Sequence, residues 1–164
     1  MELSPEEIKQ FVEKPFAFVE RAGIQAIELK PRYVKLGMPL KGNENHIGIM
    51  YAGALFTLAE VPGGALYLTT FDVSKYYPVV KEMYIRFRRP AKTDITVELS
   101  ISKERVEAIQ KETGENGKAE FTLEAELKDT AGTVVALSKG VYQLRSMAEI
   151  EKPLTVKENV TFQV

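Results

Sequence analysis

The sequence predicts an α+β domain in which an antiparallel β-sheet wraps around one long apolar helix. The first observation is an apolar run over residues 50–71 that is hydrophobic on nearly every side, as expected of a helix covered by other structure. The second is that several later segments alternate apolar and polar residues with a period of two, which is typical of antiparallel strands with one buried face. The sheet would cover one side of the helix. We expect a second copy of the chain to cover the rest.

The first residues, 1–23, are expected to be helical. Ser4 is a good helix cap, Pro5 suits the first helical position, and the two acids that follow face the positive helix end. This helix should run to about Glu13. A second short helical stretch should begin at Pro15 and end at Ala22–Gly23, where glycine permits the left-handed backbone of a helix end.

Two short strands should follow, over residues 24–29 and 33–38, and residues 40–48 have the Gly and Asn content of a loop. The central helix is expected from about Tyr51 to Thr70, and would be about 30 Å long. Pro62-Gly63-Gly64 should interrupt it, because proline lacks the amide that would bond the carbonyl of Leu58.

The second half of the chain should supply most of the sheet. Alternation predicts strands over residues 83–88, 95–101 and 121–127, and a turn at 129–132 leads into a further strand over 133–144. Residues 103–114 are charged and form either a surface helix or a long loop. The tail, 146–164, has no strong period. No repeat or linker divides the chain, so we expect a single domain over residues 1–164.

The composition excludes several classes of function. The chain has 22 Lys and Arg against 23 Asp and Glu, so nothing favours nucleic acid or an anionic membrane as a partner. It has no Cys and a single His, which excludes disulfides, a Cys nucleophile and a multi-His metal site within one chain. No apolar run reaches the roughly 18 residues of a membrane span, and the N-terminus lacks the pattern of a signal peptide. We expect a cytoplasmic protein without a metal.

Glu60 lies within the apolar helical run, beside Phe56, Leu58 and Val61. An unpaired carboxylate that is taken out of water costs several kcal/mol or has its pKa raised. Two interpretations follow. Glu60 either lies on the one wet side of an amphipathic helix, or it pairs or reacts.

A resemblance to a known family depends on two motifs. Asn45-His-Ile-Gly48-Ile-Met-Tyr51-Ala52-Gly53 leads into Ala-Leu-Phe-Thr-Leu-Ala-Glu60, and Glu82-Met-Tyr-Ile-Arg-Phe-Arg-Arg-Pro-Ala-Lys92 follows downstream. In order and spacing these resemble the hotdog-fold thioesterases, in particular the phenylacetate-pathway (PaaI-like) branch. The sequence of the helical run is more similar still to the branch found at the C-terminus of some acetyltransferase fusions (YiiD-type). The likeness extends over residues 39–145.

The resemblance implies a hotdog fold, a homodimer or dimer of dimers, and hydrolysis of acyl-coenzyme A thioesters at the subunit interface. Glu60 would be the general base or nucleophile, and Asn45 would orient the attacking water. The amide of Ala52, with Gly53 beside it, would polarise the thioester carbonyl from the opposite subunit. Free amides at a helix start can stabilise an oxyanion, and no cofactor is needed beyond the coenzyme A of the substrate.

Three positions depart from the family pattern. Tyr51 stands where the family often has His, and Ala52 stands where it often has the first Gly. Val80 falls near a position at which some relatives carry a Ser or Thr. His46, Gly48 and Tyr51 are expected to contact substrate, although His46 is either a general base or a loop-stabilising hydrogen bonder.

Arg86, Arg88, Arg89 and Lys92 form a local basic cluster. These side chains either hold the phosphates of coenzyme A or form an ordinary wet strand face. Arg88, Arg89 and Lys92 are the expected substrate contacts. Two other functions stay open: a non-catalytic dimer that binds acyl-coenzyme A, and a dehydratase or hydratase acting on 3-hydroxyacyl thioesters.

Overall fold

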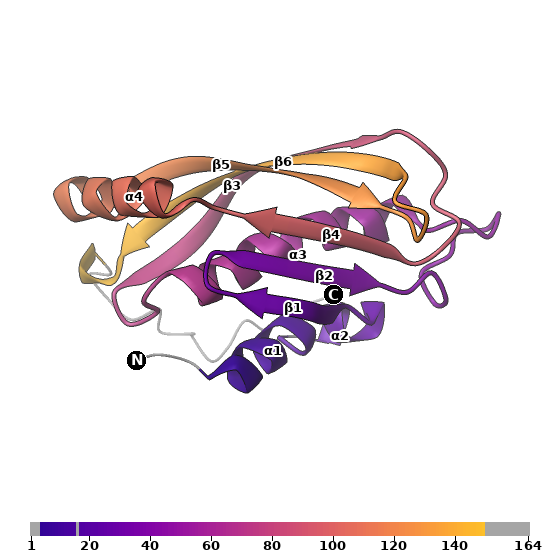
Figure 1. Ribbon diagram of the computed structural model, residues 1–164, viewed down its shortest axis with the longest axis horizontal. Coiled ribbons are helices and arrows are strands. Elements are labelled where there is room, and N and C mark those ends of the chain that lie inside the picture. The colour runs from indigo at the N-terminus through magenta and orange to yellow at the C-terminus, as the bar shows by residue number, and fades with distance from the viewer. Residues whose placement is uncertain (1–3, 16, 150–164) are drawn as a thin grey trace, which may run out of the picture.

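The computed structural model describes residues 4–15 and 17–149, which form a curved six-stranded sheet over one long helix (Figure 1). The helix is α3. The strands lie in the order β1-β2-β4-β5-β6-β3, and every neighbouring pair is antiparallel. The helices are α1 (Pro5–Glu13), α2 (Ala17–Ala22), α3 (Ala52–Thr70) and α4 (Lys103–Asn116). The strands are β1 (Gln25–Lys30), β2 (Tyr33–Met38), β3 (Tyr76–Phe87), β4 (Ile95–Ser100), β5 (Lys118–Lys128) and β6 (Val134–Ser146). A 3-10 turn over Met147–Glu149 follows.

The expected N-terminal helices are confirmed in the described residues. The Ser4 hydroxyl accepts from the amide of Glu7, and the Glu7 carboxylate accepts from the amide of Ser4. Each side chain therefore gives a hydrogen-bond acceptor to a backbone amide at the helix start. Gly23 closes α2 with a φ of 67°. In Figure 1 these two helices lie beside β1, and α1 also contacts α3. Helix α1 therefore covers part of the central helix beyond the β1 edge of the sheet.

The central helix is continuous from Ala52 to Thr70, with Pro62 inside it. The expected interruption at Pro62–Gly64 is therefore wrong. Packing explains the difference, because Leu58, Ala59, Pro62, Gly63 and Leu66 are all buried. Leu58 is fully buried, and full burial of one such side chain stabilises a fold by about 1.5–3 kcal/mol.

Strand β3 is longer than its alternation predicted, since it begins at Tyr76 rather than near residue 83. It pairs along its length with β6, and its register shifts by one residue between Val80 and Glu82. This bulge explains the missed half of the strand, because an extra residue breaks the period of two on which the prediction depended. As the last strand of the sheet, β3 has β6 as its one neighbour in the described sheet.

The charged segment after β4 is a helix, α4, which decides between the two alternatives that the sequence left open. Ser102 caps it by accepting from the amide of Arg105, and Gly117 ends it in a left-handed conformation. The turn after β5 is also confirmed, since the amide of Gly132 donates to the carbonyl of Asp129. None of the helices in the described residues combines the length and hydrophobicity needed to cross a bilayer.

Candidate functional site

Glu60 lies two turns after the start of α3 and is partly buried. Burial raises the pKa of its carboxyl above the ordinary value. In the described part of the chain, this carboxylate has no hydrogen bond and no ion pair with protein. A carboxylate whose pKa is raised by desolvation can accept a proton from water and return it near neutral pH. Glu60 is therefore not on a fully solvated side of the helix, and its role in a reaction stays a prediction.

The start of α3 offers two amides that no described protein group accepts from. Tyr51 caps the helix with its backbone, and its carbonyl accepts from Ala54 and Leu55, while its side chain caps nothing. The amides of Ala52 and Gly53 are left without a protein acceptor among the described residues. In an α-helix such amides point outward along the axis, where they can bind an oxyanion.

The Tyr51 ring lies directly against Gly53, and a Cβ at position 53 would overlap it. Tyr51 as a whole is 59% exposed. Tyr51 therefore forms one wall of the helix start, and glycine at position 53 is what allows the ring to lie there. This packing gives the departure at Tyr51 a physical account: the aromatic side chain covers the helix start that it precedes.

Asn45 shapes the loop that precedes α3. Its side-chain oxygen accepts from the amides of Ile47 (3.0 Å) and Ile49 (3.3 Å), and its own amide donates to the carbonyl of Ile49 (2.8 Å). The oxygen is thus occupied by the loop. The Nδ2 group has no partner among the described residues, and it is the part of Asn45 that can donate to water or substrate.

His46 and Gly48 lie in the same turn, and both are exposed. The amide of Gly48 donates to the carbonyl of Asn45, and its φ of 78° favours glycine, so a structural reason for this residue is evident. His46 makes no hydrogen bond or ion pair within residues 4–15 and 17–149. Neither residue touches Glu60 in these contacts, and their expected contact with substrate stays a prediction.

Backbone hydrogen bonds join the loop to the β3–β4 connection. The amide of Met50 donates to the carbonyl of Ala91 (2.8 Å), and the amide of Tyr51 donates to the carbonyl of Asn43 (2.8 Å). The side chain of Asn43 in turn donates to the carbonyls of Ala22 and Pro39, both at 2.9 Å. No role was predicted for Asn43, although an Asn inside a Gly- and Asn-rich loop often stabilises the loop through its side chain.

This connection brings the basic cluster to the helix start. Arg88, Arg89 and Lys92 flank Ala91, and all three are exposed. The amides of Arg88 and Arg89 both donate to the carbonyl of Val135, and the Arg89 guanidinium donates to the carbonyl of Val134 at 3.2 Å. Among the described residues the side chains of Arg88 and Lys92 make no ion pair, and the hydrogen bond between Met50 and Ala91 brings their segment next to the residues that precede α3.

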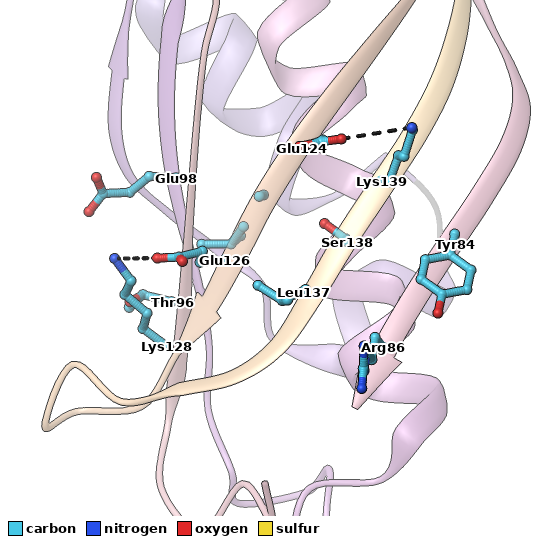
Figure 2. Close-up of a pocket in the computed structure, with 12 residues that line it drawn as sticks. Tyr84, Arg86, Thr96, Glu98, Glu124, Glu126, Lys128, Leu137, Ser138 and Lys139 are labelled. Carbon is cyan, nitrogen blue, oxygen red and sulfur yellow. Dashed lines mark ion pairs between the residues drawn. The ribbon is translucent and has the colours of Figure 1, made fainter. Parts of the chain in front are cut away.

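Arg86 lies apart from this group. It lines a hollow of about 580 Å³ on the sheet, together with Tyr84 and the polar side chains of β4, β5 and β6 (Figure 2). Exposed ion pairs cross its floor, Glu124–Lys139 at 3.8 Å and Glu126–Lys128 at 3.0 Å. The lining alternates along β5 with the buried side chains that face α3, so this hollow is on the other side of the sheet from Glu60.

Tyr142, which lies near Glu60, was not predicted from the sequence as a site residue. Tyr142 of β6 is buried, and burial together with the nearby Glu60 carboxylate raises the pKa of its phenol to about 12. Its position could have been noticed from the alternation of β6, in which Tyr142 shares a face with Leu144 and Gly140. Within the described residues, no group of three His, Asp or Glu side chains could hold a metal ion.

Comparison with known proteins shows the family of this chain. The family model described as a domain of unknown function (DUF4442) matches residues 5–157. The chain belongs to the DUF4442 family. No curated protein matches it.

Solved structures agree on the fold. A Pseudomonas aeruginosa protein, PA5026, described as a protein of unknown function and probable thioesterase, is 57% identical and has a TM-score of 0.86; the match covers 89% of this chain and 98% of that one. Thioesterase HI1161 from Haemophilus influenzae is 12% identical with a TM-score of 0.71, and the match covers 92% and 96% of the two chains. A Shewanella oneidensis protein described as a presumed thioesterase is 19% identical with a TM-score of 0.69, and the match covers 84% of this chain and 94% of that one. The last two show the fold alone. The expected hotdog fold and the resemblance to the hotdog-fold thioesterases are confirmed.

Proposed function

We propose that this protein hydrolyses acyl thioesters of coenzyme A at a site that two copies of the chain build together. The single observation that carries the proposal is the partly buried, unpaired Glu60 carboxylate on the helix whose start offers two free amides. A base and an oxyanion site are the two groups that hydrolysis of a thioester requires besides water. The kinship with PA5026, described as a probable thioesterase, supports the same reaction class.

The two groups cannot serve one carbonyl within one chain. Glu60 lies about 12 Å along the axis from Ala52, and the free amides point the opposite way, out of the helix start. A carbonyl held by these amides is therefore directed away from the Glu60 of the same helix. A second copy whose helix runs in the opposite direction would bring its amides to Glu60.

Strand β3 is the edge along which we place this second copy. Its outer edge is unpaired in the described sheet, and its side chains Val80 and Phe87 are 41% and 48% exposed. Phe56, one helical turn before Glu60, is 40% exposed. Unpaired edges with exposed apolar side chains favour association with another strand, and two β3 strands paired about a twofold axis would cover all three.

The chemistry balances without a cofactor. Glu60 takes a proton from a water molecule while the water oxygen bonds to the thioester carbon, and the carbonyl oxygen becomes an oxyanion held by the amides of Ala52 and Gly53 of the second copy. The C–S bond then breaks as the carbonyl re-forms. Glu60 returns the proton to the departing thiolate, so the products are a carboxylic acid and free coenzyme A. Asn45 would orient the water through its Nδ2 group.

Coenzyme A is the carrier that the basic residues favour. Arg88, Arg89 and Lys92 lie beside the helix start, where the acyl group would be held, and the coenzyme carries phosphates at the far end of its pantetheine arm. Cationic side chains bind phosphates through charge-assisted hydrogen bonds.

The test compares wild type with Glu60→Gln on a panel of acyl-coenzyme A thioesters, with free thiol as the readout. We expect the variant to lose at least about a hundredfold in kcat, the usual scale for a general base. Glu124→Gln is the matched control, because it removes an exposed carboxylate on the other face of the sheet. Equal rates for wild type and Glu60→Gln would refute the assignment. Thioester binding without thiol release would identify a binding protein, and loss of 2-enoyl absorbance without thiol release would identify a hydratase.

A further inference from the structure

Tyr142 occupies a space that two glycines leave open between α3 and the sheet. A Cβ at Gly63 of α3, or one at Gly140 of β6, would overlap the Tyr142 ring. The ring is 3% exposed and stacks on Phe121, with 5.9 Å between the ring centroids. Glycine inside a helix costs about 1 kcal/mol relative to alanine. One glycine of the helix and one of the strand therefore leave room for this one aromatic side chain.

The hydroxyl is the part of Tyr142 that packing does not explain. A phenylalanine would fill the same space, and buried phenols are ordinarily hydrogen-bonded. Tyr67, in the same layer, follows that rule by donating to the carbonyl of Tyr76 at 2.6 Å. The Tyr142 hydroxyl has no protein partner among the described residues.

The Tyr142 hydroxyl lies within electrostatic range of Glu60. Glu60 and Gly63 are three residues apart on α3 and so lie on the same side of the helix, and the phenol lies against Gly63. Among the described residues, Glu60 is the charged group that contributes to the raised pKa of the Tyr142 phenol. The cross-strand partner of Tyr142 is Val80, so the two side chains share a face of the sheet. The register shift of β3 begins at Val80, and such bulges often lie next to functional sites.

The positions of β3 and β6 beside Tyr142 on its own face of the sheet are uncharged. Residues paired across two strands point to the same face of the sheet. The register therefore identifies the residues of β3 and β6 that lie on the same face as Tyr142. They carry no ionisable side chain: Pro78, Val80, Met83, Gly140 and Leu144. Lys81, at the bulge, is exposed. A carboxylate and a phenol, neither with a protein partner in the described chain, thus lie near each other, and the strand positions beside the phenol are apolar.

We propose that Tyr142 is a positioning residue for the water that Glu60 activates. The phenol donates a hydrogen bond to the water oxygen, and the water donates one of its own to the Glu60 carboxylate. The remaining lone pair of the water is then directed at the thioester carbon. This inference rests on the proposed function, and it supplies from β6 a hydroxyl that Val80, its neighbour on β3, does not have.

The test uses Tyr142→Phe, which keeps the ring between the two glycines. Tyr67→Phe is the matched control, since it removes a phenol from the same layer that donates to backbone instead. The first readout is kcat and KM on an acyl-coenzyme A thioester. We expect kcat to fall about threefold to tenfold in Tyr142→Phe with KM unchanged, the scale of one neutral hydrogen bond, and no such change in Tyr67→Phe.

The second readout is independent of turnover. Carboxyl ¹³C NMR of the free protein, with the Glu60 signal assigned by Glu60→Gln, gives the titration of Glu60 directly. We expect the pKa of Glu60 to rise further in Tyr142→Phe, because the water that donates to the ionised carboxylate loses the phenol that holds it in place. An unchanged Glu60 titration would overturn the inference, and so would an unchanged kcat in an active enzyme. If wild type hydrolyses no thioester, the proposed function fails and the titration alone decides the role of Tyr142.

Discussion

The Tyr142 ring of β6 fills the space that a side chain at Gly63 of α3 would need. The helix can therefore approach the sheet at this point only with glycine at position 63. The adjacent Gly64 is exposed and has no atom near its missing Cβ. Of these two consecutive glycines, Gly64 has room for a side chain, whereas Gly63 does not.

We predict that Gly63→Ala destabilises the fold by about 1–3 kcal/mol, the usual range for overpacking a core. Gly64→Ala, the matched control, should instead stabilise the helix by about 0.5–1 kcal/mol, because alanine loses less backbone freedom on folding. Urea unfolding of the two variants and wild type measures both effects. Equal stability of the two variants would show that the contact between Gly63 and Tyr142 does not limit the approach of helix and sheet.

The stability of the protein should depend on pH through Glu60. Burial raises its folded-state pKa above the unfolded value, so the protonated form favours folding. This contribution is fully present below the unfolded pKa and is lost as pH rises through the folded pKa. Glu60→Gln should therefore gain stability over wild type above the folded pKa, and the gain should disappear in acid.

Thermal unfolding of wild type and Glu60→Gln over a pH series measures this difference. Glu124→Gln controls for the loss of one negative charge, since that carboxylate is exposed. A stability difference between wild type and Glu60→Gln that stays constant with pH would contradict the burial of Glu60. The same ionisation should limit activity, with hydrolysis falling as pH drops through the pKa of Glu60.

Asn45 offers a way to separate loop structure from chemistry. Asn45→Asp keeps an oxygen that can accept from Ile47 and Ile49 but loses the Nδ2 donor, whereas Asn45→Ala loses both. If the amide orients water, kcat should fall at least about tenfold in both variants, on the scale of one lost hydrogen bond in the transition state, while only Asn45→Ala loses stability. Steady-state kinetics and thermal unfolding measure the two effects. Full activity in a stable Asn45→Asp would confine Asn45 to the loop.

The basic residues near the helix start should recognise phosphate rather than the acyl group. Arg88→Ala and Lys92→Ala should each raise KM for an acyl-coenzyme A by about fivefold to tenfold, the scale of one charge-assisted hydrogen bond, with little change in kcat. KM for the matching acyl-pantetheine, which lacks the nucleotide phosphates, should stay unchanged. Arg86→Ala is the control, because Arg86 lines the hollow on the other face of the sheet. Equal effects on the two substrates would exclude phosphate recognition.

The sequence predicted the elements wherever a local pattern was unbroken. The cap at Ser4, the alternation in β4 and β5 and the turn at Gly132 each depend on a few neighbouring residues, and each is confirmed. The prediction failed where a distant contact changed the outcome. The start of β3 was missed because a bulge opposite β6 broke its period, and Pro62 left the helix continuous because the sheet packs against it.

In the candidate site, too, some features follow from local sequence and others depend on tertiary contacts. The presence of an acid in an apolar helix, seven residues after Gly53, is determined by the sequence, because helical spacing alone fixes where Glu60 lies relative to the helix start. The occupation of the Asn45 oxygen by its own loop, the arrival of Ala91 beside Met50 and the position of Tyr142 near Glu60 were decided only by the tertiary structure. Each joins groups far apart in the chain or depends on how a loop folds back, and no local pattern specifies which strand lies beneath a given turn of a helix.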